Sequence, residues 1–263
     1  LKFGKLHDYA HQVGAGFVAS GHYARLTRDH AGRAQLRRGV DTGKDQSYVL
    51  FGSPRERLER MLLPIGAFRK ADVRAHAERL GLPVFDKPDS QEICFVPDQD
   101  YAGLIERRRP DLARPGEIRD TDGNALGEHA GQHRFTIGQR RGIGVAFGRP
   151  VYVVDKDPST NTVTVGSRED LRSASLTASQ TNWLAPEPPP RDWTPVHAQI
   201  RYNAPPVPAD ARSEGRGEAR VFQVRFAEPQ AAVAPGQAVV LYDRAQPDVV
   251  LGGGWIDAAD RDA

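Results

Sequence analysis

The chain has 263 residues, of which 39% are hydrophobic and 27% charged, and its 36 basic and 34 acidic side chains leave a formal charge of +2. This length suggests about two domains, and the balance excludes a disordered, strongly charged tail. A transmembrane protein is excluded because no apolar run approaches the ~18 residues of a membrane span. The single cysteine, Cys94, excludes an internal disulfide and a cysteine-rich zinc site, and it favours a cytoplasmic location.

The first part of the chain alternates between helical and strand patterns. Apolar side chains at helical spacing predict three helices, at residues 1–13, 54–62 and 71–80. Gly14 and Gly81 are the expected C-terminal caps of the first and third, and Ser53 with Glu56 forms the expected capping box of the second. Short apolar runs predict two strands, at residues 17–19 and 34–40. This order is typical of an α/β domain, which we place at residues 1–110.

The rest of the chain is rich in strand patterns. Short β-branched runs separated by turn residues predict strands and no helix, at residues 151–154, 162–165, 221–226, 238–242 and 249–251. Eight prolines lie between positions 186 and 208. We therefore expect a small β-rich central domain at residues 111–168 and a β-barrel or sandwich at residues 169–263.

Few residues stand out as candidates for catalysis, metal binding or nucleotide binding. Cys94 fits either a buried thiol between apolar neighbours or a nucleophile or sulfur carrier on a polar loop. His129 and His133 are four residues apart, but the glycines around them argue against a helical metal site. Gly142 and Gly144 favour a tight turn over a nucleotide-binding loop, because no strand–loop–helix pattern surrounds them.

Basic residues occur in short clusters along the chain. Solvated surface is the ordinary interpretation of each cluster. Together they also fit contact with an extended polyanion, where affinity comes from many phosphate contacts. The clusters are Arg37-Arg38, Arg107-Arg108-Arg109, Arg140-Arg141 and the pair Arg201-Tyr202.

Eight short motifs follow one another in an order that carries a family resemblance. They are Gly-His-Tyr-Ala-Arg at 21–25, Lys-Asp-Gln-Ser-Tyr at 44–48, Asp-Ser-Gln-Glu-Ile-Cys-Phe at 89–95, Thr-Ile-Gly-Gln-Arg at 136–140, Tyr-Val-Val-Asp-Lys-Asp at 152–157, Ile-Arg-Tyr at 200–202, Pro-Gly-Gln at 235–237 and Leu-Gly-Gly-Gly at 251–254. This succession resembles the bacterial tRNA-specific 2-thiouridylases, and the resemblance runs from Leu1 nearly to the C-terminus.

The resemblance implies both a fold and a reaction. The fold is an α/β nucleotide-binding domain of the ATP-pyrophosphatase type (adenine nucleotide alpha-hydrolase-like), a small central domain and a C-terminal β-barrel. The reaction is 2-thiolation of the wobble uridine of tRNA with ATP and Mg²⁺, in which ATP adenylates the C2 oxygen and sulfur from a cysteine persulfide displaces AMP. A cysteine desulfurase or a sulfur-relay protein would supply the sulfur, and no membrane is involved.

The resemblance also assigns roles to single residues. Cys94 matches the persulfide-bearing cysteine, and Gly21 matches a position at the ATP site. An Arg-Tyr pair combines a phosphate contact with stacking on an unpaired base. The positions that match tRNA contacts are His22, Lys44, Asp45, Gln46, Arg201, Tyr202 and Gln237.

Two features of the family have no counterpart here. These are a Ser-Gly-Gly-Val-Asp-Ser loop that cradles ATP phosphates and a second catalytic cysteine, which lies just upstream of the segment that matches residues 1–4. We expect this chain, which begins within a predicted helix, to be the downstream part of a thiouridylase and to be inactive alone. The alternatives are a non-catalytic tRNA-binding module and a plain β-barrel interaction domain on an α/β remnant.

Overall fold

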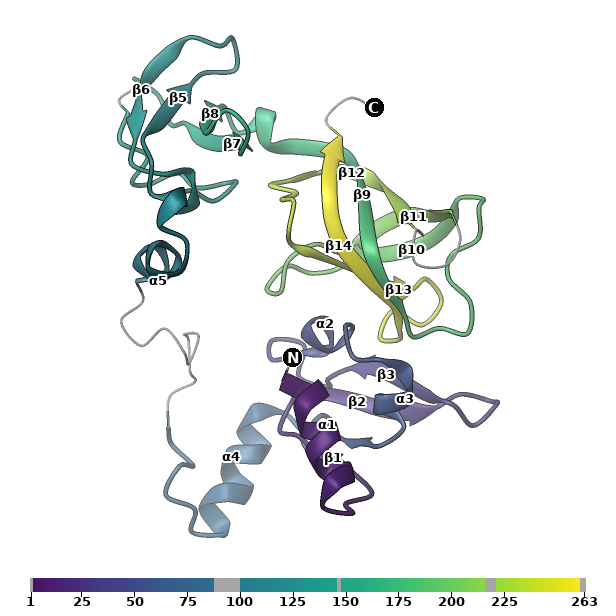
Figure 1. The fold of residues 1–263 in the computed structure, drawn as a ribbon. Helices are drawn as coiled ribbons and strands as arrows, with labels where there is room; N and C mark the ends of the chain where they lie inside the picture. Colours follow the sequence, from purple (N-terminus) through teal and green to yellow (C-terminus); the bar gives the residue numbers. More distant parts are fainter. Residues whose placement is uncertain (1, 88–99, 146–147, 216–220, 261–263) are drawn as a thin grey trace. The chain divides into compact units, whose positions relative to one another are not determined.

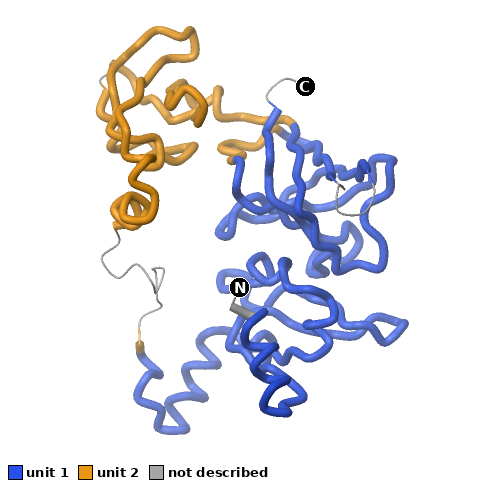
Figure 2. The backbone as a smooth tube through the Cα atoms, viewed as in Figure 1, with its two compact units in different colours: residues 1–86, 175–228, 235–260 blue, residues 87–174, 229–234, 261–263 orange. Residues whose placement is uncertain are grey.

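The computed structural model describes residues 2–87, 100–145, 148–215 and 221–260. The chain forms two compact units, drawn in blue and orange in Figure 2. Unit 1 contains residues 1–86, 175–228 and 235–260, and unit 2 contains residues 87–174, 229–234 and 261–263. Residues 1–86 of the predicted first part and most of the predicted third part therefore belong to one unit, whereas residues 87–110 of the first part belong to unit 2.

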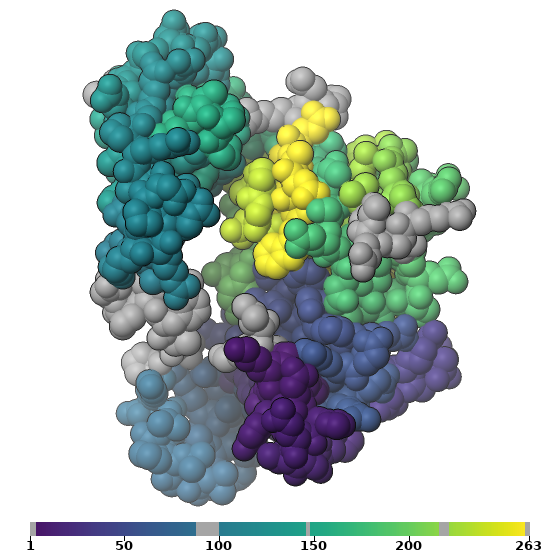
Figure 3. Space-filling model, viewed as in Figure 1, coloured from purple at the N-terminus to yellow at the C-terminus, as the bar shows by residue number. Residues whose placement is uncertain are grey.

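The N-terminal part of unit 1 is a mixture of helices and short strands (Figure 1). Its elements are α1 (Lys2–Gln12), β1 (Val18–Ala19), β2 (Ala24–Arg28), β3 (Ala34–Arg38), α2 (Ser47–Leu50), α3 (Arg55–Leu58), β4 (Met61–Leu62) and α4 (Lys70–Arg79). β1 and β4 pair in parallel, and β2 and β3 form an antiparallel hairpin. The predicted helices at the N-terminus and before Gly81 are confirmed, and atoms of α1 (purple) lie at the surface in Figure 3.

The helix predicted over residues 54–62 is confirmed only in its first part. α3 ends at Leu58, and Met61–Leu62 is strand β4. The N-cap position belongs to Pro54, which makes no side-chain cap, so the expected capping box does not form. Residues 60–62 instead form backbone hydrogen bonds with β1, since the amide of Val18 donates to the carbonyl of Arg60 at 2.9 Å. Tertiary pairing thus overrides the local helix signal.

The C-terminal part of unit 1 is a closed barrel in the strand order β10-β11-β12-β9-β14-β13. The predicted C-terminal β-barrel is therefore confirmed. The strands are β9 (Arg172–Trp183), β10 (Thr194–Gln199), β11 (Val207–Glu214), β12 (Val221–Ala231), β13 (Ala238–Asp243) and β14 (Val250–Asp260). β10 crosses the proline-rich stretch at 186–208. Pro195 is exposed while Val196 and Ala198 are buried, so the alternation of a strand persists through the proline.

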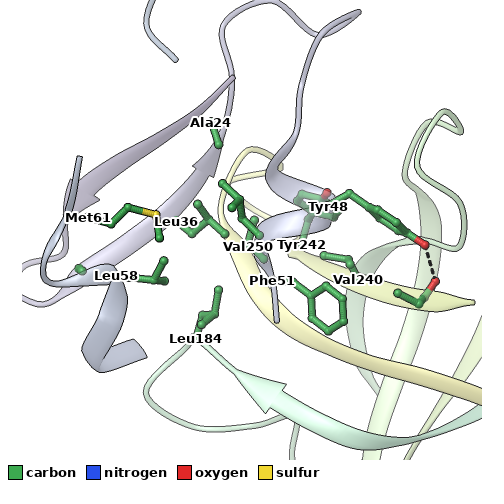
Figure 4. Packing of buried hydrophobic residues seen from close by; sticks show 13 residues of the cluster. Ala24, Leu36, Tyr48, Phe51, Leu58, Met61, Leu184, Val240, Tyr242 and Val250 are labelled. Carbon is green, nitrogen blue, oxygen red and sulfur yellow. Dashed lines mark hydrogen bonds between the residues drawn. The ribbon is translucent and has the colours of Figure 1, made fainter. Parts of the chain in front are cut away.

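One continuous core joins the two parts of unit 1 (Figure 4). Leu36, Leu58 and Met61 of the N-terminal part pack in the same cluster as Leu184 and Val250 of the barrel. The backbone continues the contact, because the amide of residue 38 in β3 donates to the carbonyl of residue 248, just before β14, at 2.7 Å. This packing fixes the loops that follow β3 against the barrel.

Unit 2 contains a short helix and a four-stranded sheet in the order β6-β5-β8-β7. Its elements are α5 (Tyr101–Arg108), the 3₁₀ turns Pro110–Leu112, Gln132–Arg134 and Glu169–Leu171, and strands β5 (Gly116–Arg119), β6 (Ala125–His129), β7 (Tyr152–Asp157) and β8 (Thr162–Gly166). The buried side chains of Ile118, Val153 and Val163 form its centre. Among the described residues, no helix is long and apolar enough to span a membrane.

His129 and His133 do not share a helix, as the glycines around them indicated, because His129 ends β6 and His133 lies in the 3₁₀ turn that follows. The ring of His129 is buried, with Nε2 3.1 Å from the carbonyl oxygen of Asn161 and Nδ1 accepting from the amide of Gly131 at 3.0 Å. His133 Nε2 lies 2.8 Å from a carboxylate oxygen of Glu106. No group of three metal-binding side chains occurs in the described ranges.

Candidate nucleic-acid interface

Three segments that the sequence singled out meet around the buried ring of Tyr48 in unit 1. Tyr48 lies in α2, directly after the loop that carries Lys44, and its ring centre is 6.2 Å from that of Tyr202. Its hydroxyl donates to the carbonyl of Ala238 at 2.8 Å, a bond drawn as a dashed line in Figure 4. Gln237, which precedes Ala238, is exposed. Burial raises the pKa of Tyr48 to about 12, so its hydroxyl stays protonated at neutral pH.

A chain of buried polar groups connects the loop before α2 to the barrel. The carboxylate of Asp45, whose side chain is 5% exposed, accepts from Nε of Arg38 at 2.7 Å and from the hydroxyl of Ser47 at 3.0 Å. The Ser47 hydroxyl oxygen lies 3.2 Å from that of Tyr242, which donates to Oε1 of Gln199 at 2.7 Å. A buried polar group without a hydrogen-bond partner destabilises the fold. This series of hydrogen bonds therefore holds the loop before α2 in one position.

Gln199 ends the chain of contacts at the turn after β10. Its side-chain nitrogen donates to the carbonyl of Arg201 at 3.0 Å and to that of Tyr202 at 2.9 Å. A single amide therefore fixes both residues of the turn by their backbone. Their side chains are exposed, and the ring of Tyr202 is 40% exposed.

A cavity of about 570 Å³ opens beside this turn. Its lining includes Arg38, Asp45, Gln199, Tyr202 and Asn203, so one aromatic ring and several polar groups face the same space. A cavity of similar volume, about 550 Å³, lies beside α1 and is lined by none of the predicted site residues. The cavity beside the turn after β10 is thus the one that residues of the motifs at 44–48 and 200–202 line.

The loop after β1 is tied to the loop before α2. The backbone amide of Tyr23 donates to Oε1 of Gln46 at 3.0 Å, and the amide of Gln46 donates to the carbonyl of Tyr23 at 2.8 Å. His22 Nδ1 lies 2.6 Å from the hydroxyl oxygen of Ser20, and Gly21 is exposed. The structure thus brings the motif at 21–25 next to the motif at 44–48.

Cys94 lies in residues 88–99, outside the described residues. Its assignment as a sulfur carrier therefore stays a prediction.

Several residues of this site were not singled out by the sequence. Ser47 lies within a quoted motif and Gln199 just before one, but Tyr242 ends an apolar run and is indistinguishable there from core. Arg38 stood out only as part of a basic cluster. The structure pairs it with Asp45 at 2.7 Å, and Arg37 pairs with Asp248 at 3.0 Å, so both serve within the fold.

The chain matches three described families along nearly its whole length. Residues 1–98 match "tRNA methyl transferase HUP domain", residues 104–167 match "tRNA methyl transferase PRC-barrel domain", and residues 173–256 match "Aminomethyltransferase beta-barrel domain". These limits follow the α/β part, the sheet of unit 2 and the barrel.

Several curated relatives are named as tRNA-specific 2-thiouridylases. The chain is 48% identical over 261 residues to the tRNA-specific 2-thiouridylase MnmA of Rhodopirellula baltica, covering 98% of this chain and 64% of the relative. It is 46% identical over 258 residues to tRNA-specific 2-thiouridylase MnmA 2 of Thermoanaerobacter sp., covering 98% and 69%. The corresponding protein of Maricaulis maris is 44% identical, covering 97% and 62%. The chain therefore spans about two thirds of the length of these relatives.

Proposed function

The chain belongs to the family of tRNA-specific 2-thiouridylases, and we propose on this premise that the protein takes part in ATP-dependent 2-thiolation of the wobble uridine of tRNA. The observation that carries the proposal is the 44–48% identity, over 97–98% of the chain, to relatives that bear this name. The reaction uses tRNA and ATP, so we place it in the cytoplasm.

The chemistry requires that the C2 oxygen of uridine become a leaving group. Transfer of AMP from ATP to that oxygen releases pyrophosphate and provides one, and Mg²⁺ would neutralise the phosphates of the nucleotide. The terminal sulfur of a persulfide on Cys94 would then attack C2, and AMP would depart with the oxygen. A second thiol, in the family the second catalytic cysteine, would break the sulfur–sulfur bond by forming a disulfide with Cys94, which leaves one sulfur on C2. A thiol reductant would return that disulfide to two thiols. A cysteine desulfurase or a sulfur-relay protein would recharge the cysteine.

Gly21 fits a position against the nucleotide. It follows β1, which pairs in parallel with β4, and loops at the carboxyl ends of parallel strands commonly bind nucleotides. A Cβ built on Gly21 would meet only the Cδ1 atom of Ile65, at 3.9 Å, so the backbone there is open to close approach.

The groups around Tyr48 fit single-stranded RNA. Lys44 and Arg201 supply positive charge, and the exposed ring of Tyr202 offers a stacking surface beside a polar cavity. Asp45 acts within the protein, because its buried carboxylate orders the loop that carries Lys44 and Gln46. His22 and Gln237 complete the proposed contacts.

Binding of unmodified tRNA by Tyr202 variants tests the interface. Tyr202→Ala should weaken binding by about 1–3 kcal/mol, the usual contribution of one stacked base. Tyr202→Phe keeps the ring and should bind like wild type. If Tyr202→Ala also binds like wild type, the ring is not part of the interface. Affinity should fall as salt rises, because Arg201 and Lys44 act on phosphates.

Mass spectrometry tests the role of Cys94. Incubation with a cysteine desulfurase and cysteine should add one sulfur atom to the protein, and a thiol reductant should remove it. The adduct should be absent from Cys94→Ser. An adduct that survives this substitution would remove Cys94 from the mechanism.

The product distinguishes thiolation from the methyl transfer named in two of the matching family descriptions. Nucleosides from tRNA of cells that lack the gene should regain 2-thiouridine when the gene is restored. A methylated uridine instead would contradict the proposed reaction.

A further inference from the structure

The side chain of Gln139 holds one loop of unit 2 in place through hydrogen bonds within that loop. The loop runs from Thr136 to Gly144, within and after one of the quoted motifs. The amide of Thr136 donates to Oε1 of Gln139 at 3.0 Å, and Nε2 of Gln139 donates to the carbonyl of Arg141 at 2.9 Å. Both ends of the Gln139 side chain therefore clamp the loop to itself.

The loop is also anchored on both sides. The amide of Gly138 donates to the carbonyl of Val153 at 2.8 Å, and the amide of Val153 donates to the carbonyl of Gln139 at 2.9 Å, which binds the loop to β7. On the other side, the side chain of Ile143 is buried in the core of the sheet. Nζ of Lys156 donates to the carbonyl of Phe135 at 2.9 Å, just before the loop begins.

Arg140 and Arg141 lie between these anchors and are exposed. Within the ranges that the structure describes, neither guanidinium has an ion pair or a hydrogen bond. Two other exposed arginines of the same unit differ, since Arg109 pairs with Asp111 and Arg119 pairs with a glutamate two residues away. The loop thus presents two adjacent positive charges that the protein itself does not neutralise.

We propose that Arg140 and Arg141 form a second contact with tRNA, made to phosphates of its backbone and separate from the interface around Tyr48. The inference rests on the proposed function for the identity of the RNA. A guanidinium group can form a bidentate pair of hydrogen bonds with a phosphate. A loop that is already ordered loses little conformational entropy when it binds. Because the contact is to phosphates, it adds affinity without reading sequence.

The test is tRNA binding by the double variant Arg140→Ala/Arg141→Ala at several salt concentrations. Loss of two phosphate contacts should make the slope of log affinity against log salt shallower by about 1.4–1.8. The matched control is Arg109→Ala/Arg119→Ala, which removes the same charge from exposed, ion-paired positions of the same unit and should keep the wild-type slope. Arg140→Lys/Arg141→Lys keeps the charge and should retain most of the slope.

The outcomes separate this inference from the proposed function. If wild type binds tRNA and the Arg140→Ala/Arg141→Ala variant has the same affinity and slope, the second contact does not exist while the proposed function stands. If both double alanine variants lower the slope equally, general charge explains the effect and the inference fails. If wild type binds no tRNA, both proposals fall.

Discussion

Replacing Tyr242 by phenylalanine should destabilise unit 1 through a single lost hydroxyl. The Tyr242 side chain is fully buried, and its hydroxyl is the donor to Oε1 of Gln199 at 2.7 Å. Phenylalanine keeps the ring, so no cavity opens and the guanidinium of Arg38, 5.6 Å from the ring centre, keeps its contact. The change therefore isolates the polar contribution.

The expected magnitude comes from the partner that is left behind. Gln199 is 3% exposed, so water does not reach its Oε1 to replace the lost donor. A buried acceptor without a partner costs about 1–3 kcal/mol, and we expect the free energy of unfolding to fall by that amount. The Ser47 hydroxyl, which lies 3.2 Å from the Tyr242 hydroxyl oxygen that the substitution removes, still donates to Asp45, and this limits the loss.

Urea unfolding of wild type and variant measures this difference. Tyr9→Phe is the matched control, because it removes a hydroxyl from a side chain that is 60% exposed on α1 and should change stability by less than about 0.5 kcal/mol. If the free energy of unfolding of Tyr242→Phe is also within about 0.5 kcal/mol of wild type, the hydrogen bond from Tyr242 to Gln199 does not stabilise unit 1.

Three further predictions concern titration and packing. Tyr48 should ionise near pH 12 in an ultraviolet titration, so the stability that its burial provides is complete below pH ~10 and lost as pH rises through about 12. Gly253→Ala should cost about 1–3 kcal/mol in thermal or urea unfolding, because its Cβ would overlap a carbonyl of β13, whereas Gly52→Ala enters open space and should be neutral. Hydrogen bonds from Ser159 lower the pKa of Asp157 to about 2, so an NMR titration should show its carboxylate protonating only near that pH. The stability it adds is present above its unfolded pKa of about 3.9 and is lost as pH falls through about 2, a dependence that Asp157→Asn should remove.

Elements whose signals are local were predictable from the sequence. α1 and α4 follow from apolar spacing and from the glycines after them, and Gly81 adopts the positive φ of +66° expected of a helix C-terminus. Strands such as β7, β8 and β13 follow from short β-branched runs between turn residues. The motifs themselves indicated the family and, through it, the barrel.

Other features depended on partners far away in the sequence. Met61 and Leu62 have helical spacing with Leu58, yet they form a strand because β1 offers a parallel partner and the core accepts Met61. β10 crosses a proline-rich stretch because the strands on both sides of it, β11 and β13, supply the remaining hydrogen bonds of the barrel. Local propensity is weak beside such pairing.

By itself, the sequence determined the kinds of residue at the candidate interface and the order of the motifs that carry them. The tertiary structure alone decided that these motifs meet at Tyr48, and that Gln199 and Tyr242 link them. A buried glutamine or tyrosine has no periodic pattern that distinguishes it from core, because its role depends on which polar atom lies opposite. Only the closing of the barrel against the loop before α2 places Asp45, Ser47, Tyr242 and Gln199 in one line of contacts.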